Sequence, residues 1–402
     1  MSTGATVSAF VSGPTVVTHT GPSKARVPWY IWTGVIAVTS AAIGGSWDVS
    51  WHRSIGRDSF WTPAHMAIYA CGVLAGIVGL YLVLTTTFGK SEQAQRLRDV
   101  SVNIFGLRAP LGVFLAGWGG VAMLTSAPFD NWWHNAYGLD VKIVSPPHAL
   151  LILGIRAVSF GMLFLILAAM NRAAATGDNN FKTLRLLFLY LGGVAVGGQM
   201  FFIQEFTENV RLHRASAYIA VAIAVPVLLA TFSQATRFRW AATTTASVYT
   251  TFLIAEILIL PLFPATPKLG PVYYPVTHMV PAQFPMLIVV PALALDLFWR
   301  RVRNWKPWQI ALVSGVLFLA VLLAVQWPFG DFLMSPYSRN RFFATADFDY
   351  GTTPDSFGRN FRFYHSDYGL TLAKGLLTAA AWAIVSTWIG LGFGRWMRGV
   401  QR

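Results

Sequence analysis

Long apolar runs separated by short polar segments make up most of this 402-residue chain. A helix needs about 20 consecutive apolar residues to cross a hydrocarbon core of about 30 Å. Runs of that length predict ten membrane-spanning helices, at 28–46, 63–87, 109–127, 147–170, 184–203, 216–234, 241–262, 280–298, 308–327 and 370–391. The pattern therefore predicts an all-α integral membrane protein, a polytopic bundle of about ten transmembrane helices.

Composition agrees with a membrane location, because 55% of the residues are hydrophobic and only 11% are charged. The formal net charge of +14 would also suit nucleic-acid binding. Most Lys and Arg residues, however, fall in alternate loops between the predicted spans. The positive-inside rule places those loops, and with them both termini, in the cytoplasm. We therefore expect a multi-pass protein of the cell inner membrane, in contact with the lipid bilayer and with no nucleic-acid partner.

The predicted spans suggest three regions along the chain. Residues 1–27 have the composition of a disordered cytoplasmic tail, and 28–171 form a duplicated four-helix unit. Residues 172–402 form a second membrane half, in which the long outer loop 329–368 is expected to act as a cap. Cys71 is the single cysteine, so any metal ligands must be nitrogen or oxygen atoms.

A pattern of Asp and His residues occurs twice within the first four predicted spans. In each copy a His follows an Asp by four residues, a second Asp follows the first by ten, and a His preceded by proline opens the next span. The two copies are Asp48, His52, Asp58 and His65, then Asp130, His134, Asp140 and His148. An Asp and a His four residues apart share one face of a helix and can approach one ion. The repeat therefore predicts two metal sites at a membrane edge.

Two imidazoles and one carboxylate suit copper, iron or zinc. Without thiolates, and facing outwards, the sites favour copper, with iron as the alternative. The expected ligands are Asp48, His52, His65, Asp130, His134 and His148. Asp58 and Asp140 are expected to act in catalysis, by orienting the imidazoles through hydrogen bonds or by moving protons.

The segment Asp48-x-x-Trp51-His52-x-x-x-x-Arg57-Asp58-x-x-x-Thr62-Pro63-x-His65 resembles a metal-site motif. That motif belongs to the C subunit of copper membrane monooxygenases, the particulate methane and ammonia oxidisers. The second copy is similar to a further site of the family, an Asn, a His four later and a His fourteen beyond, although Asp130 stands in place of the Asn. The resemblance covers about residues 45–150 and is that of a distant relative. The last 200 residues have no assigned counterpart in the shorter C subunit.

The resemblance implies a copper-dependent subunit that activates O2 at the outer membrane face and hydroxylates a small apolar substrate. It also implies partner subunits in the membrane or periplasm. Electrons would come from a quinol or an outer-face donor, because no nicotinamide or flavin fingerprint is evident. Three alternatives stay open: a non-catalytic copper-binding or copper-handling protein, a bis-histidine haem cytochrome, and a structural subunit of a membrane redox complex.

Charge inside a membrane span is costly and usually faces the interior of a bundle, and the ionisable residues that stand out within predicted spans are Arg156, Glu256 and Lys374. Arg156 follows His148 by about two helical turns. Glu256 is expected either to pair with Arg156 or to relay protons.

Overall fold

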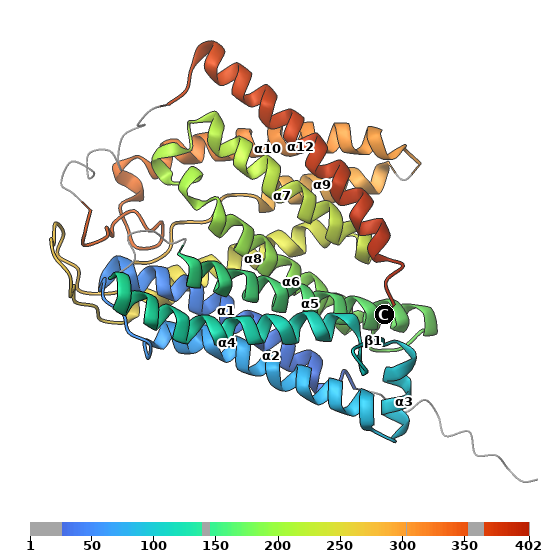
Figure 1. The fold of residues 1–402 in the computed structure, drawn as a ribbon. Coiled ribbons are helices and arrows are strands. Elements are labelled where there is room, and N and C mark those ends of the chain that lie inside the picture. The colour runs from blue at the N-terminus through green and yellow to red at the C-terminus, as the bar shows by residue number, and fades with distance from the viewer. Residues whose placement is uncertain (1–25, 139–144, 303, 353–365, 402) are drawn as a thin grey trace, which may run out of the picture.

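The computed structural model describes residues 26–138, 145–302, 304–352 and 366–401. Asp140 and nearly all of the predicted N-terminal tail lie outside these ranges. Ten helices of the described chain run back and forth along one bundle (Figure 1): α1 (Trp29–Ser54), α2 (Pro63–Phe88), α4 (Leu111–Tyr137), α5 (Pro146–Thr176), α6 (Phe181–Phe202), α7 (Ala215–Thr236), α8 (Ala241–Ile259), α9 (Val289–Arg301), α10 (Pro307–Leu333) and α12 (Gly369–Met397).

Eight helices of the described chain are long and apolar enough to cross a membrane. The chain is therefore a polytopic helical membrane protein. α1 and α9 are the two remaining helices of the bundle. The predicted span 280–298 is helical only from Val289, because Pro281 and Pro285 lack the amide hydrogens that a helix needs. α9 is thus a helix of 13 residues that follows an extended segment.

α1 and α4 run beyond the ends that hydropathy predicted. α1 continues from the predicted residue 46 to Ser54, and α4 continues from 127 to Tyr137 with Pro128 inside it. These added turns carry polar residues, and a prediction from hydropathy therefore ends the span before them. Their consequence is that Asp48 and Asp130 lie on helices rather than in loops.

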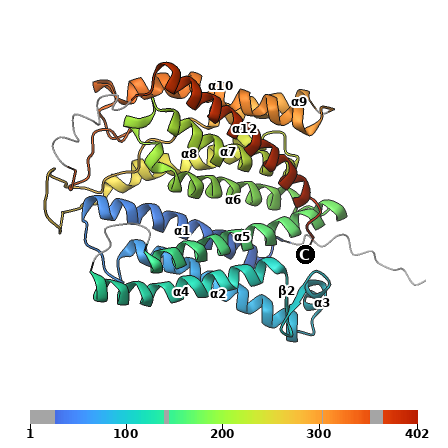
Figure 2. The ribbon, with the colours of Figure 1, turned by 45° about the horizontal axis from the view of Figure 1, so that its top comes forward.

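Two hydrophobic cores hold the bundle together. The first joins α1, α2, α4 and α5 with much of α6. The second joins α7, α8, α9, α10 and α12 with the far end of α6. Figure 2 shows α6 between the two groups of helices. The expected boundary at residue 171 is therefore bridged by a helix that belongs to both cores.

Small residues let neighbouring helices approach closely. A Cβ atom at Gly119 of α4 would lie 2.7 Å from the Gly154 carbonyl oxygen of α5. A Cβ atom at Gly44 of α1 would lie 2.9 Å from the Ala64 carbonyl oxygen of α2. Such contacts are shorter than side-chain atoms tolerate, so only glycine allows these crossings. The crossings fix α1 against α2 and α4 against α5.

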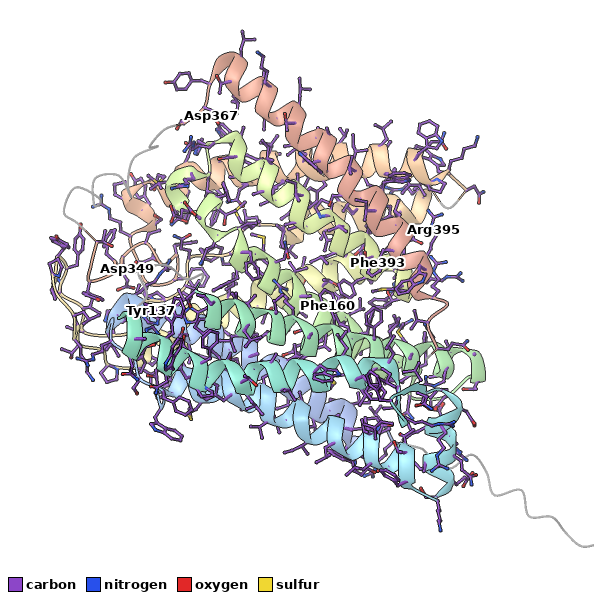
Figure 3. The ribbon with its side chains drawn as sticks, viewed as in Figure 1. Tyr137, Phe160, Asp349, Asp367, Phe393 and Arg395 are labelled. Carbon is purple, nitrogen blue, oxygen red and sulfur yellow. The ribbon has the colours of Figure 1, made fainter. Side chains whose placement is uncertain are left out.

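The two ends of the bundle differ in character. One end, on the right in Figure 1, carries the short helix α3 (Glu92–Asp99) and a hairpin of β1 (Val102–Ile104) and β2 (Leu107–Ala109), paired antiparallel. The other end carries the short helices η1 (Gln204–Phe206), η2 (Asn209–Arg211), η3 (Leu260–Leu262) and η4 (Pro336–Ser338). Figure 3 places Tyr137 and Asp349 at this second end and Arg395 at the first.

The loop expected at 329–368 begins only after Leu333, because α10 extends to that residue. Its described segment 334–352 reaches the end of α1, where the Tyr350 amide donates to the Arg53 carbonyl at 3.2 Å. The Tyr350 carbonyl in turn accepts from the Tyr273 amide at 2.7 Å. These hydrogen bonds tie two loops to the same helix end.

Candidate metal centre

The two copies of the Asp/His pattern occupy two matched helix hairpins at one end of the bundle. Asp48 and His52 lie on the last two turns of α1, and His65 is the third residue of α2. Asp130 and His134 lie near the end of α4, and His148 is the third residue of α5. We call Asp48, His52, Asp58 and His65 site 1, and Asp130, His134 and His148 site 2.

Local sequence explains how each second helix begins beside the first. Both α2 and α5 start with proline, whose fixed φ suits the first position of a helix. The Thr62 hydroxyl accepts from the Ser59 amide at 2.8 Å and shapes the loop before α2. The Ser145 hydroxyl caps α5 by accepting from the His148 amide at 3.4 Å. The third residue of each helix, a His, thereby faces back towards the preceding helix.

In site 1, two carboxylates approach two imidazoles. His65 Nε2 lies 3.2 Å from Asp48 Oδ1 and 3.4 Å from Asp58 Oδ2. His52 Nε2 lies 3.8 Å from Asp48 Oδ2 and 3.5 Å from Asp58 Oδ2. The His65 side chain is 12% exposed, whereas that of His52 is 47% exposed. One imidazole is thus held inside the site and the other stands at its rim.

In site 2, Asp130 lies between two imidazoles. His134 Nε2 is 3.4 Å from Asp130 Oδ2, and His148 Nε2 is 3.4 Å from Asp130 Oδ1. One donor atom from each of the three residues lies within 4.8 Å of the others. Site 1 does not meet this criterion in the described structure, and its imidazoles stand further apart. Site 2 is therefore the more convergent of the two sites.

Backbone carbonyls determine which ring nitrogen faces each site. His65 Nδ1 lies 2.9 Å from the Ser59 carbonyl oxygen, and His134 Nδ1 lies 3.2 Å from the Gly138 carbonyl oxygen. A carbonyl oxygen can only accept, so Nδ1 carries the hydrogen. The Nε2 lone pair of a neutral ring then faces carboxylate oxygens. That arrangement requires a positive charge between them, either a proton or a metal ion.

The His–Asp distances can be compared with those expected between ligands of one metal ion. Four ligands about 2.1 Å from one ion at tetrahedral angles lie about 3.4 Å apart. The His–Asp separations in the two sites are 3.2–3.8 Å. A direct hydrogen bond is shorter, as the pair His278 Nε2 and Asp347 Oδ1 illustrates at 2.7 Å. The separations in the repeat are longer than that hydrogen bond and similar to the 3.4 Å between His213 Nε2 and Asp331 Oδ1, a pair outside the two sites.

No protein-family model, curated protein or solved structure matches this chain. The assignment of these residues therefore rests on their own geometry.

The structure brings together all six residues expected as ligands, in two groups of three. Asp58 faces the Nε2 atoms rather than an Nδ1 atom, so it does not orient either ring from the far nitrogen. Ser59 and Gly138 supply the orienting contacts through their carbonyls instead. Sequence reasoning missed both, since a backbone oxygen carries no residue signature. Asp140 lies outside the described residues.

A bis-histidine haem is incompatible with this geometry. A haem ligand needs an open axial direction in front of its Nε2 atom. His65 Nε2 has carboxylate oxygens at 3.2 Å and 3.4 Å in that direction. The same position is occupied in front of His134 by Asp130, at 3.4 Å. A porphyrin ring could not enter between these groups.

Tyr69 connects the surroundings of the two sites. It lies on α2 one turn beyond His65, with the ring centroids 6.0 Å apart. The charges of Asp130, Asp48 and Asp58 all act on its phenol group. α2 packs against both α1 and α4, which places Tyr69 between site 1 and site 2.

Two ion pairs lie in the loops near the end of α1. Asp349 Oδ2 lies 3.7 Å from Arg53 Nε, and Glu208 Oε2 lies 3.3 Å from Arg211 Nε. Burial raises the pKa of Asp349, and Arg53 opposes that rise. Burial also raises the pKa of Glu208, opposed mainly by Arg211. These pairs form a polar layer beside site 1.

Proposed function

We propose that this protein is a membrane metalloprotein that binds copper at sites 1 and 2 and catalyses the O2-dependent hydroxylation of a small apolar substrate. The observation that carries the proposal is the matched geometry of the two sites. In each, carboxylate and imidazole atoms stand 3.2–3.8 Å apart with Nδ1 held by a carbonyl. The sequence resemblance to copper membrane monooxygenases supplies the reaction class.

The donor set supports copper. Imidazole nitrogen is a ligand of copper, iron and zinc, and a set of two imidazoles with one carboxylate leaves coordination positions open for other molecules. Asp48, His52 and His65 would hold one ion, with Asp58 near enough to join them. Asp130, His134 and His148 would hold the other. Iron is the alternative metal for the same donors.

Copper bound there would supply the one-electron and oxygen chemistry of the reaction. The chain itself would hold the imidazoles in one tautomer, through Ser59 and Gly138, and keep carboxylates beside them. The overall reaction balances as substrate C–H plus O2 plus a quinol, giving substrate C–OH, water and a quinone. Asp58 is placed to take up or release a proton at the edge of site 1, where its side chain is 12% exposed.

The proposal includes an orientation. Basic residues cluster in the loops at the end opposite to the sites, as on the cytoplasmic side of a membrane. Sites 1 and 2 would then face the outside of the inner membrane, with both termini in the cytoplasm. The sequence resemblance implies partner subunits in the membrane or periplasm that meet this outer face.

Metal analysis of the purified full-length protein tests the proposal. We expect about two copper ions per chain, since the repeat provides two donor sets. His65→Ala and His148→Ala should each lose about one ion. His278→Ala is the matched control, because its imidazole forms an ordinary hydrogen bond with Asp347 at 2.7 Å, and it should keep both ions. O2 consumption with a reductant should then depend on an apolar substrate and fall in the two site variants.

Two results would contradict the proposal. If the protein contains no metal after reconstitution with copper, the proposal of two metal sites is refuted. Copper in the wild type that both His65→Ala and His148→Ala retain would place the metal elsewhere. Iron in place of copper would keep the sites and change the chemistry.

The exposure of His52 favours a second candidate, a non-catalytic copper-handling protein. An imidazole that is 47% exposed at the rim of site 1 can receive or release an ion directly. Such a protein would exchange copper with a chelator within seconds and would consume no O2. A catalytic protein should retain copper during the same treatment.

A further inference from the structure

A cavity of about 460 Å³ lies between α1, α5, α6, α8 and the segment 280–286. This volume falls in the range of pockets that hold small molecules. Its lining is mainly apolar, with Val38, Leu163 and Leu191 among the contributors. α6 packs against both α5 and α8, and all three helices line the cavity. An apolar molecule of moderate size would be accommodated.

One wall of the cavity carries a buried carboxyl group. Both carboxyl oxygens of Glu256 on α8 are buried, and neither has a hydrogen-bond partner of acceptable geometry among the described residues. The Ser46 side chain of α1 lies nearby. A buried carboxyl group in that state costs free energy, and a ligand that donates a hydrogen bond would recover it.

The α5 wall carries a guanidinium group with spare donors. Arg156 donates to the Gly198 carbonyl oxygen at 2.9 Å, and its charge lies 4.8 Å from the centre of the Phe202 ring. It forms no ion pair with an acidic residue in the described part of the chain, and the expected pair with Glu256 is not formed. Its remaining N–H groups can donate to a ligand oxygen.

We propose that this cavity binds a membrane-soluble quinol, a dihydroxy-aromatic ring with an apolar tail. One ring hydroxyl donates to Glu256, and the oxygen on the other side of the ring accepts from Arg156. The tail lies along the apolar wall. A simple alcohol has one oxygen and could satisfy only one of these two separated groups, and an alkane could satisfy neither.

The cavity adjoins site 1 through a single helix. Ser46, Val49 and Arg53 of α1 line the cavity, and Asp48 and His52 of the same turns belong to site 1. A quinol that is oxidised to a quinone releases two electrons and two protons, which the reaction proposed above consumes together with O2. That role rests on the proposed function, whereas the binding itself does not require the metal.

Equilibrium binding to the full-length protein in nanodiscs tests the inference, with a quinol bearing a ten-carbon tail as the probe under anaerobic conditions. Empty nanodiscs correct for partition into lipid. We expect Glu256→Leu and Arg156→Met each to weaken binding at least tenfold. Both replacements are apolar and of similar size, so they suit the membrane interior. Decylbenzene, which has no oxygen, should bind no better to wild type than to Glu256→Leu.

Two glycine-to-leucine variants, one inside and one outside the cavity, provide the matched control. A Cβ atom at either Gly45 or Gly76 would meet no heavy atom within 4 Å, but only Gly45 lines the cavity. Gly45→Leu should therefore abolish quinol binding, and Gly76→Leu should leave it unchanged. Uptake equal to that of empty nanodiscs, or equal binding by wild type, Glu256→Leu and Arg156→Met, would overturn the inference. Copper content measured on the same samples separates this result from failure of the metal sites.

Discussion

The close crossing of α1 and α2 should determine both the stability of the protein and the copper affinity of site 1. Substitutions at the adjacent glycines Gly44 and Gly45 test this directly. A Cβ atom at Gly44 would lie 2.8 Å from the Ile68 nitrogen and 2.9 Å from the Ala64 oxygen. At Gly45 it would meet nothing within 4 Å. Gly44→Ala should therefore force the helices apart, whereas Gly45→Ala should not.

The magnitude follows from these distances. Contacts of this kind prefer about 3.5 Å, so the helices must separate by about 0.6 Å. Overpacking of this kind costs about 1–3 kcal/mol. Replacement of glycine by alanine in a helix contributes about 0.5–1 kcal/mol of stability, and this gain is common to both variants. The difference in unfolding free energy between Gly44→Ala and Gly45→Ala should thus be about 1–3 kcal/mol.

Site 1 should respond to the same change. Asp48 follows Gly44 by one helical turn, and His65 follows Ala64 directly, so a separation there reaches the 3.2 Å contact between Asp48 and His65. Metal–ligand distances tolerate only about 0.2 Å. Copper affinity at site 1 should fall in Gly44→Ala and stay unchanged in Gly45→Ala.

Detergent-solubilised protein would be used for both measurements, unfolding by denaturant and copper titration. Equal stability of the two variants would refute the close-packing argument. Reduced stability of Gly44→Ala with unchanged copper affinity would refute the coupling between the crossing and site 1.

Two further predictions concern the order of metal binding and the response to acid. The donors of site 2 converge within 4.8 Å, so site 2 should bind copper more tightly than site 1 and copper should titrate in two steps. His134→Ala should remove the tighter step and His52→Ala the weaker one. Loss of the weaker step in His134→Ala and of the tighter step in His52→Ala would contradict the geometry. Burial lowers the pKa of His213, against the opposing charge of Asp331. Its contribution to stability is therefore complete above the unfolded-state pKa of about 6.5 and is lost as the pH falls below that value, through the lower pKa of the folded state. The melting temperature of His213→Gln should therefore fall less than that of wild type between about pH 7.5 and 5, and parallel curves would refute this.

The sequence predicted the helical membrane architecture well, because hydrophobic length is a direct requirement of a bilayer. Its errors have local causes. The segment 280–288 is apolar but contains prolines, and hydropathy does not register a missing amide hydrogen. The last turns of α1 and α4 are polar but helical, since they lie at the end of the bundle and need no apolar surface.

The candidate sites were predicted in part. The spacing of Asp48, His52 and His65 was sufficient to place them together, because four residues make one helical turn and the proline positions the next helix. Asp58 was expected beside the imidazoles, but the ring nitrogen that it faces depends on the path of the loop 55–62. Glu256 and Arg156 stood out in the sequence because a charged side chain inside a membrane span costs free energy. The cavity that both residues line depends on how α5, α6 and α8 pack.

The two hairpins show how one local design can give two different sites. Each uses a glycine crossing, a proline-started helix and a carbonyl that holds Nδ1, all of which are set by short-range sequence. What differs is the environment beyond the hairpin. Site 1 includes a second carboxylate, Asp58, in contact with both imidazoles, whereas Asp130 alone lies between the imidazoles in the described part of site 2. A site with two carboxylates stabilises a higher positive charge, so site 1 should favour the more oxidised state of a bound ion. The cavity adjoins site 1 across α1, where Ser46 and Val49 line it, and its α5 wall begins at Ile152, one turn beyond His148 of site 2.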